Sequence, residues 1–539
     1  MTGPAITTGQ TLGPSTAVAP TLQAGMTASP NSGIGPFTFA TLPTLNIPAG
    51  TVLQTTDQGW CTWNGLFWTQ GTGNRKVVAK LRAAIAQALT TNPATAQPLI
   101  QPSAHPGDTQ AITKGQSFSN GGNNYTCIVA GTTGVATKPT ATTTGALVDG
   151  TVSWYYMGPT FTTNANAPTY TNVVAASKYT GTYWTNTANV RNDGTVNVLD
   201  DTNFLVTGGP VTATGINSSW TSSLTSSIAF AVSFMTDAQS FQIETTGTGN
   251  TVFSIYVNGV PLTLAYGSLA TNGQSINYSQ LVFPTKAVRL ITVEITSGSA
   301  FVGVLSIDKT SKVWAPYLSN SVRMVVTGSS FISGSTQHPV TPSLSWGGLM
   351  CKYLNMLDYW QDNQGSGTGW IANASGSGFA FGATSRMTPI VAYNPELLIF
   401  AGGGINDSAV AGITVAQEQA AIVATLQAYR LALPGALILV IGAEAGAKGP
   451  TAAIFNMELA ASQAVAQLAD PNILFIPQCY TTAAKAWCSG TGTTAATNTS
   501  GNSDIYIGAD TTHPVQAGVF YFAQQSANGI INAINSIPY

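Results

Sequence analysis

The sequence predicts a multidomain chain, with β-rich modules and a β-sandwich in its N-terminal part and a three-layer α/β domain after them. Its 539 residues exceed the roughly 250 to 300 that one hydrophobic core usually serves. Up to about residue 315, short β-prone runs are separated by Gly, Asn and Ser, as in all-β domains. From about residue 318, apolar runs alternate with helical patterns. This alternation indicates a parallel sheet with helices on both faces.

The composition excludes several classes of partner. Charged residues form 7% of the chain, against about 25% in an average soluble protein. A net charge of -2 with 18 Lys+Arg leaves no basic stripe to neutralise phosphates, which argues against nucleic acids and anionic membranes. No apolar run reaches the roughly 18 residues of a membrane span, and the start MTGPAITTGQ lacks the features of a signal peptide. We therefore expect no nucleic acid, no membrane and no export by a signal peptide.

The sequence of the N-terminal part predicts an extended arm followed by a small module. Residues 1–45 are rich in Pro, Gly, Thr and Ala, which predicts an extended arm that gains order only by packing on something else. Residues 46–105 predict a small attachment module, because a short β-like run with three tryptophans precedes a helical pattern at 75–89. We interpret that pattern as a solvated amphipathic linker helix, and we assign His105 to a linker.

Two β-rich segments follow. In residues 106–160, a "YTC" strand, a "GTTG" turn and a closing "DGTVSWYYMG" resemble the small carbohydrate-binding-like modules of phage tail proteins. There, Trp154, Tyr155 and Tyr156 either stack on sugar rings or form the core of the module. Residues 165–315 contain alternating stretches such as "SIAFAVSFMT" and "AVRLITVEITSG", which predict a β-sandwich.

The C-terminal segment predicts four strands and three long helices. The expected strands lie in "SVRMVVTGSS", "PELLIFAGGGIND", "ALILVIGAE" and "NILFIPQ", and the helices lie at about 414–432, 452–469 and 515–535. In such sheets, ligands bind beyond the carboxyl ends of the strands. The polar residues expected at that edge are Ser329, Ser330, Asn406, Asp407, Asp510 and His513.

These residue types form a complete set for acyl transfer. The chain has only 3 histidines, so a proton shuttle near neutral pH has few candidates. We predict Ser330 as nucleophile, His513 as base and Asp510 as the carboxylate that orients the imidazole. Asn406 supplies an amide donor for an oxyanion. Asp504 is the alternative carboxylate, Ser329 is the alternative nucleophile, and His338 is interpreted as a loop residue.

The motifs "TGSS", "GGGIND" and "DTTHP" occur in the order of the blocks of the SGNH (GDSL-like) hydrolases, and residues 318–539 resemble that family. The resemblance implies a flavodoxin-like parallel sheet and a serine esterase without a cofactor or metal. It also implies a glycine in "DNQGSGTGW" that completes an oxyanion hole with Ser330 and Asn406. Gly367 is the expected residue, and Gly365 and Gly369 are alternatives. Ser329 departs from the family, which often has Asp there.

The order of the domains implies a setting for this activity. The segment 165–315 resembles the jelly-roll domains that precede this hydrolase domain in some carbohydrate esterases. Together with the arm and the polar modules, this resembles a phage tail fibre or tailspike that removes O-acetyl groups from a surface polysaccharide. The expectation is then a virion or extracellular location, a homo-oligomer with a trimer as one option, and virion tail proteins as partners of the arm. The alternatives are a non-catalytic receptor-binding protein with a relict hydrolase fold, and a secreted esterase or lipase for small esters.

The 5 cysteines show no metal-binding spacing. We expect most of them to be small buried residues. A disulfide between Cys479 and Cys488 is the alternative for that pair.

Overall fold

The computed structural model describes the parts of the chain given at the end of this paragraph. The predicted arm, residues 1–45, lies outside them, as do His338 and Gly365. For the segments 52–55, 59–63 and 68–70, the backbone alone is described. The described residues are 52–55, 59–63, 68–70, 77–84, 104–135, 138–142, 146–159, 169–173, 204–208, 211–214, 219–222, 230–247, 252–262, 269–270, 276–295, 299–305, 311–316, 322–333, 345–356, 358–362, 367–373, 379–447, 449–479, 486–492 and 501–537.

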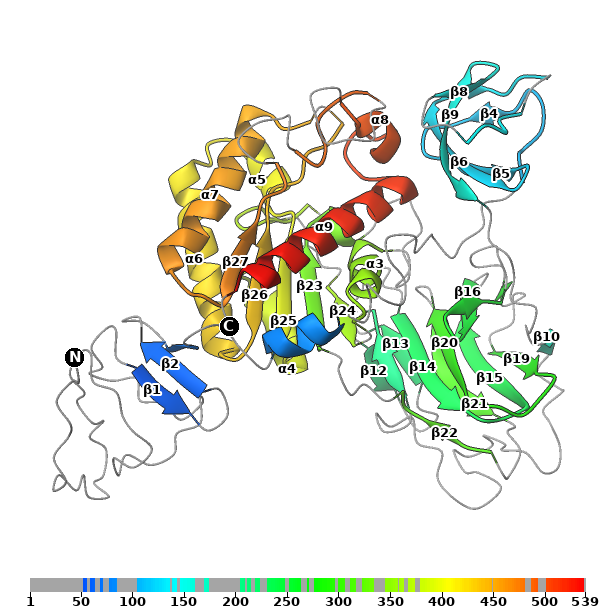
Figure 1. Ribbon diagram of the computed structural model, residues 1–539, viewed down its shortest axis with the longest axis horizontal. Coiled ribbons are helices and arrows are strands. Elements are labelled where there is room, and N and C mark those ends of the chain that lie inside the picture. Colours follow the sequence, from blue (N-terminus) through cyan, green and yellow to red (C-terminus); the bar gives the residue numbers. More distant parts are fainter. Residues whose placement is uncertain are drawn as a thin grey trace.

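A five-stranded parallel sheet forms the centre of the C-terminal part (Figure 1). Its order is β24-β23-β25-β26-β27, and every neighbouring pair is parallel. Numbered along the chain, this is the order 2-1-3-4-5 of flavodoxin-like sheets, so the predicted parallel sheet is confirmed. The strands are β23 Met324–Gly328, β24 Tyr359–Gln361, β25 Leu397–Ala401, β26 Leu437–Ile441 and β27 Ile473–Ile476.

Helices cover both faces of this sheet. Residues alternate between the faces along a strand: Met324 and Val326 pack in one apolar cluster with α3 and α9, and Val325 packs in another with α4, α6 and α7. The three long helices α6, α7 and α9 begin and end within one residue of their predicted bounds. The helices are α2 Ser330–Ser333, α3 Trp346–Tyr353, α4 Thr384–Tyr393, α5 Gly404–Ala409, α6 Val415–Ala432, α7 Ala452–Leu468, α8 Ser503–Tyr506 and α9 Gln516–Ser536.

Two antiparallel sheets lie in the segment predicted as a sandwich. Their facing side chains, among them Phe230, Phe241 and Ile291, share one apolar core. The jelly-roll character of this segment stays a prediction. One sheet has the order β10-β19-β15-β21-β13-β12, and the other has the order β11-β14-β20-β16-β17 with β18 and β22 paired beside it. The strands are β10 Thr169–Val173, β11 Leu205–Thr207, β12 Val211–Thr214, β13 Ser219–Ser222, β14 Phe230–Thr236, β15 Ser240–Gly247, β16 Val252–Val257, β17 Val260–Pro261, β18 Leu269–Ala270, β19 Ile276–Val282, β20 Arg289–Ile295, β21 Ser299–Leu305 and β22 Val313–Trp314.

The preceding segment forms a small β-module, residues 104–159. Trp154 is 1% exposed in its core, and Tyr155 is buried against the C-terminal part. The option that these two rings stack on sugars is therefore wrong. His105 belongs to the module rather than to a linker, because its Nε2 lies 2.9 Å from Asp149 Oδ2. The strands are β4 Ala111–Ile112, β5 Ser117–Asn120, β6 Asn123–Val129, β7 Gly131–Thr132, β8 Leu147–Asp149 and β9 Val152–Pro159.

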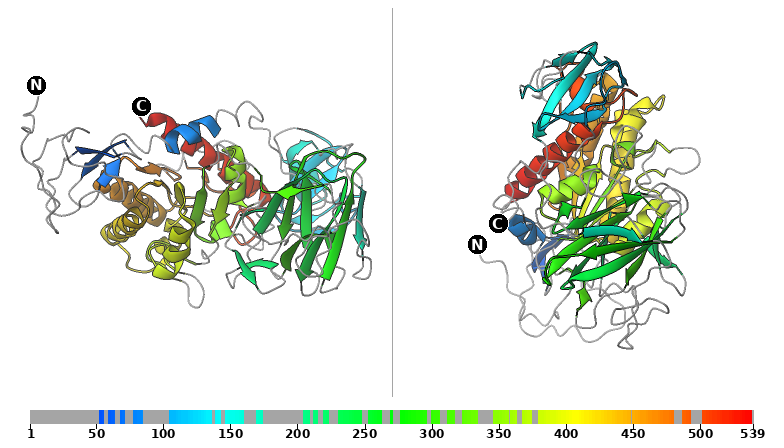
Figure 2. Two further views of the ribbon diagram at one scale, coloured as in Figure 1. Left: turned by 90° about the horizontal axis from the view of Figure 1, so that it is seen from below. Right: turned by 90° about the vertical axis from the view of Figure 1, so that its right-hand side faces the viewer.

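Before this module, a three-stranded sheet of β1 Val52–Thr55, β2 Gly59–Trp63 and β3 Trp68–Gln70 is followed by a helix at 77–84. The helix packs against the C-terminal part beside the end of α9 (Figure 2). Its apolar side chains Val77, Val78, Leu81 and Ala84 are buried in the core that contains α3 and α9.

Polar contacts fix this helix in place. The Arg82 guanidinium donates to the carbonyls of Ile534 and Ile537, each at 2.9 Å, and Lys80 pairs with Glu396 at 2.6 Å. The interpretation as a solvated linker is therefore wrong, because the apolar face found a partner surface more than 450 residues away in the sequence.

The cysteines with described side chains are free and buried. Cys479 Sγ donates to the Ala443 carbonyl at 2.7 Å, and Cys488 Sγ donates to the Gly446 carbonyl at 3.3 Å, so these two residues form no disulfide. Among the described helices, none combines the length and apolar character that crossing a bilayer requires.

Candidate active site

Three segments meet at the carboxyl edge of the parallel sheet. Ser330 is the first residue of α2, directly after β23, and Asn406 lies in α5, which follows β25. Asp510 and His513 lie between α8 and α9. Because β23 and β25 are neighbours at the point where the strand order reverses, this is the edge where ligands bind in such sheets.

The structure brings the three predicted triad residues into one hydrogen-bonded chain. His513 Nε2 lies 2.8 Å from Ser330 Oγ, and His513 Nδ1 lies 2.7 Å from Asp510 Oδ2. An ionised carboxylate can only accept, so Nδ1 carries the hydrogen and Nε2 is left to accept from the serine hydroxyl. The Asp510 and His513 side chains are 32% and 23% exposed. The pair therefore remains in reach of a substrate from solution.

A tight turn holds the carboxylate against its own histidine. Asp510 Oδ1 accepts from the backbone N–H groups of Thr512 at 3.0 Å and His513 at 2.9 Å, while the Gly508 N–H donates to the His513 carbonyl at 2.8 Å. Thr511 between them has φ 61, a left-handed conformation that is rare for a β-branched residue.

The same contacts set the charge of Asp510. Burial acts to raise the pKa of Asp510, but hydrogen bonds from the His513 ring and from the two backbone N–H groups outweigh it and hold the pKa below its ordinary value. The carboxylate therefore stays charged in the pH range where it must orient the imidazole.

Ser329 and Ser330 have different surroundings. Ser329 is fully buried, and its Oγ donates to Glu444 Oε1 at 2.9 Å, whereas Ser330 is half-buried and faces His513. Burial raises the pKa of Glu444 well above its ordinary value. The geometry therefore favours Ser330 over Ser329 as the residue that meets a substrate.

Asn406 faces the loop that contains the candidate glycines. Its Nδ2 donates to the Thr368 carbonyl at 2.8 Å, which places the amide beside Gly367. Gly367 has φ +67, a conformation that suits glycine. The Gly369 N–H donates to the Ala372 carbonyl at 3.0 Å, and a Cβ at Gly369 would come within 2.0 Å of Asp407 Oδ2. The arrangement favours Gly367 over Gly369 as the oxyanion donor.

Asp407 anchors this loop through hydrogen bonds, a role that the sequence did not reveal. Its carboxylate is fully buried and accepts from the N–H groups of Trp370 at 2.8 Å, Ile371 at 3.0 Å and Ala372 at 2.6 Å. Asp407 thereby ties α5, which carries Asn406, to the loop that carries Gly367. Asn-Asp in a glycine loop is usually turn chemistry, and the sequence gave no sign of these distant donors.

Arg386 is a second supporting residue that the sequence analysis missed. It is fully buried and donates through Nη2 to the Gly328 carbonyl at 2.5 Å, two residues before Ser330. Its Nε pairs with Asp362 Oδ2 at 2.5 Å, and Nη1 donates to Thr368 Oγ1 at 3.0 Å. The Arg386 guanidinium thus joins the end of β23, which precedes Ser330, to the loop beside Asn406. The sequence offered one indication of such a role. Charged residues form only 7% of the chain, and a charged side chain that is buried must have a partner.

The alternative carboxylate, Asp504, does not join the histidine. Its Oδ1 pairs with Lys114 of the small β-module at 3.0 Å, and its Oδ2 accepts from the Gly492 N–H at 3.0 Å. These contacts place the small β-module beside α8, on the segment that leads to the Asp510 turn. Among the described residues, no group of three or more His, Cys, Asp or Glu side chains could hold a metal ion.

The chain matches no protein-family model and no curated protein sequence. Among solved structures, it is similar to a family two carbohydrate esterase from Cellvibrio japonicus, at 14% identity over 62% of this chain and 96% of that chain, with a TM-score of 0.43. A family two carbohydrate esterase from Clostridium thermocellum in complex with cellohexaose shows 14% identity over 62% and 99% of the chains, with a TM-score of 0.41. An acetyl xylan esterase from Butyrivibrio proteoclasticus shows 12% identity over 63% and 97%, with a TM-score of 0.40. The assignment of the site rests on the side-chain geometry described above.

Proposed function

We propose that the protein is a serine esterase whose catalytic triad is Ser330, His513 and Asp510. The observation that carries the proposal is the continuous chain of hydrogen bonds from Ser330 Oγ through both ring nitrogens of His513 to Asp510. It lies at the ligand-binding edge of a parallel sheet. This arrangement activates a hydroxyl nucleophile. An intact triad also speaks against a relict hydrolase fold.

The reaction begins when His513 Nε2 takes the proton of Ser330 Oγ as that oxygen attacks the ester carbonyl carbon. The imidazolium, stabilised by Asp510, then gives the proton to the alcohol oxygen as its bond to carbon breaks, leaving an acyl-serine. Water attacks this ester while His513 takes its proton, and the acid leaves as Ser330 regains its hydrogen. No cofactor enters these steps.

The negative charge on the carbonyl oxygen needs donors that are in place before reaction. We propose the backbone N–H groups of Ser330 and Gly367 and the side-chain amide of Asn406. In the free enzyme, the Asn406 amide donates to the Thr368 carbonyl, so its orientation is held before a substrate arrives. Arg386 and Asp407 support the two backbone segments on which these donors stand.

For the substrate, we propose O-acetyl esters on a polysaccharide. The support is the order of the domains, because residues 165–315 resemble the jelly-roll domains that precede an SGNH-like hydrolase domain in some carbohydrate esterases. The small β-module lies against α8 through Lys114 and Asp504, where it can contact a long substrate near the Asp510 turn. The phage-tail setting, the oligomeric state and partners of the arm stay predictions from the sequence.

The test is release of acetate from O-acetylated bacterial polysaccharides, compared with a small soluble aryl acetate. Wild-type protein should release acetate from both, and Ser330→Ala should release almost none. Ser536→Ala is the matched control, because this exposed serine only donates to the Ala533 carbonyl at the end of α9. Retained activity in Ser330→Ala contradicts the triad. Hydrolysis of the aryl ester without any polysaccharide deacetylation contradicts the substrate alone.

A further inference from the structure

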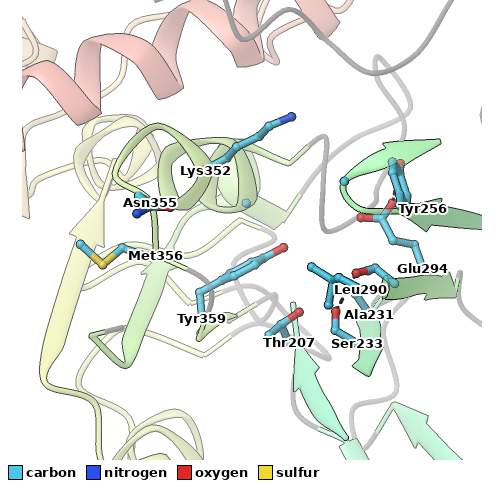
Figure 3. Close-up of a pocket in the computed structure, with 13 residues that line it drawn as sticks. Thr207, Ala231, Ser233, Tyr256, Leu290, Glu294, Lys352, Asn355, Met356 and Tyr359 are labelled. Carbon is cyan, nitrogen blue, oxygen red and sulfur yellow. Dashed lines mark hydrogen bonds between the residues drawn. The ribbon is translucent and has the colours of Figure 1, made fainter. Parts of the chain in front are cut away.

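A cavity lies between the outer face of the β11-β14-β20-β16 sheet and the C-terminal end of α3 with the start of β24 (Figure 3). Its volume is about 240 Å³, slightly below the roughly 300 to 1,000 Å³ of typical small-molecule sites. Such sites often lie where two folded parts meet. The lining residues used below are Ala231, Ser233, Tyr256, Thr292, Glu294, Lys352 and Tyr359.

The cavity lies at the edge of the parallel sheet opposite to the triad. Tyr359, which lines it, begins β24 and pairs with Met324 at the start of β23, whereas Ser330 follows the end of β23 at Gly328. Four residues of a strand span roughly 13 Å. A ligand in the cavity therefore does not occupy the place of the reacting ester.

Strand alternation explains the polar lining. In β20, Ile291 and Val293 are fully buried in the sandwich core, so their neighbours Thr292 and Glu294 point to the outer face. On an ordinary sandwich, that face would meet water. Here the C-terminal part covers it, and Glu294 is only 3% exposed.

The lining combines aromatic surface with convergent hydrogen-bonding groups. The Tyr256 hydroxyl donates to Glu294 Oε2 at 3.1 Å, and the Ser233 and Thr292 hydroxyls are paired at 2.8 Å. Tyr359 faces these groups from the opposite wall (Figure 3). Burial raises the pKa of Tyr359 well above its ordinary value, so its hydroxyl keeps its hydrogen and can donate.

We propose that this cavity is a non-catalytic binding site for one neutral pyranose sugar unit. A pyranose has an apolar ring face that suits a tyrosine ring and a rim of hydroxyls that both donate and accept. The Glu294 carboxyl group and the Tyr359 hydroxyl supply the matching acceptor and donor. The size admits one ring.

Charge argues for a neutral ligand rather than an ionic one. An acidic sugar would bring its carboxylate next to Glu294, which is itself buried, and like charges repel. The Lys352 side chain, which also lines the cavity and interacts electrostatically with Glu294, would repel a cationic ligand. Each of the two residues also attracts the charge that the other repels, so together they give no net preference for either sign of charge. A neutral sugar has neither penalty.

The experiment is ligand-observed NMR titration of the full chain by saturation transfer. The probes are methyl β-glucopyranoside, methyl β-galactopyranoside and methyl N-acetyl-β-glucosaminide, with methyl β-glucuronide and methyl β-glucosaminide as charged counterparts. At least one neutral glycoside should bind more tightly than both charged probes. Glu294→Gln should weaken that binding roughly tenfold, because a hydrogen bond to a charged acceptor is roughly twice as strong as one to a neutral acceptor. Ala231→Met, which fills the cavity from β14, should abolish it.

Controls distinguish loss of binding at this site from misfolding and from binding at the proposed catalytic triad. Lys286→Ala, at a lysine that pairs with Asp237 away from the cavity, should bind as wild type does. Each variant should melt within a few degrees of wild type, and Ser330→Ala should keep the binding. The proposal is overturned if no neutral glycoside binds, or if folded Glu294→Gln and Ala231→Met both bind as wild type does. Tighter binding of either charged probe overturns the assignment to a neutral ligand.

Discussion

Glu418 offers a quantitative test of how burial shifts the protonation of a carboxyl group near Asp407. It lies in the first turn of α6 and is fully buried. Burial, together with the charge of the nearby Asp407, raises its pKa from the ordinary 4.5 to about 9. Folding therefore holds a proton on this carboxyl group at neutral pH. We predict that Glu418→Gln, which mimics the protonated form, stabilises the C-terminal part increasingly as the pH rises.

The magnitude follows from linkage. A carboxyl group whose pKa is raised by folding stabilises the fold fully below its unfolded-state pKa, and this contribution is lost as the pH rises toward the folded-state pKa. With pKa values of 4.5 and about 9, the wild type loses about 4 kcal/mol from this group between pH 5 and 8, at about 1.36 kcal/mol per pH unit. The glutamine variant loses nothing from this position.

Hydrogen-exchange mass spectrometry measures this difference within the relevant part of the chain. Opening free energies of amides in β25, β26 and α6 are compared between wild type and Glu418→Gln at pH 5, 6, 7 and 8. The variant should gain about 4 kcal/mol relative to wild type across that range. Glu396→Gln, at a side chain that is 31% exposed, should show a far smaller dependence. A constant difference between Glu418→Gln and wild type at all four pH values refutes the reasoning.

Three further predictions concern the proposed reaction. Ser330→Ala should lower kcat by roughly 10⁴-fold or more without loss of stability. Ser329→Ala should instead destabilise the fold by about 1 to 3 kcal/mol, because it strands a buried partner, and the opposite pattern in kinetics and urea unfolding would exchange the two roles. Asn406→Ala should lower kcat by roughly 10²- to 10³-fold with little change in KM, and an effect on KM alone would make Asn406 a substrate-positioning residue. On the acidic side of the pH–rate profile, the rate should rise with pH in a single step, because His513 must be neutral to accept a proton. Because the pKa of Asp510 is lowered, this residue should add no second step to the profile above about pH 5. Two steps between pH 5 and 8 would contradict the assigned roles of His513 and Asp510.

The sequence was most informative for strands and helices that are long enough to show a clear local pattern. The strands β25, β26 and β27 are continuous apolar runs, and the helices α6 and α7 are rich in alanine and other strong helix formers, so their positions were predicted closely. Because polar residues directly after parallel strands lie at one edge of the sheet, the placement of Ser330 and Asn406 at that edge was predictable too.

Short or irregular elements were not predictable from local pattern. The strand β24 has three residues and includes the polar Gln361, whose amide group is buried through bonds to the Ile332 carbonyl and the Gly347 N–H. The helix α4 contains Pro389, which ordinarily argues against a helix interior. Partners were harder still, because a pattern at 77–84 shows an apolar face without showing which surface covers it.

The docking of helix 77–84 has a consequence for how the chain is made. Arg82 and its acceptor at Ile537 are 455 residues apart, and a ribosome adds about 5 to 20 residues per second. The helix therefore leaves the ribosome roughly 20 to 90 s before α9 can receive it. During that interval, Val77, Val78 and Leu81 lack their partner surface, while domains that fold from nearby segments can already form. The contact between helix 77–84 and α9, the first and last described helices, therefore forms late. During synthesis, temporary protection of this apolar face would matter more than protection of any β-module between the two helices.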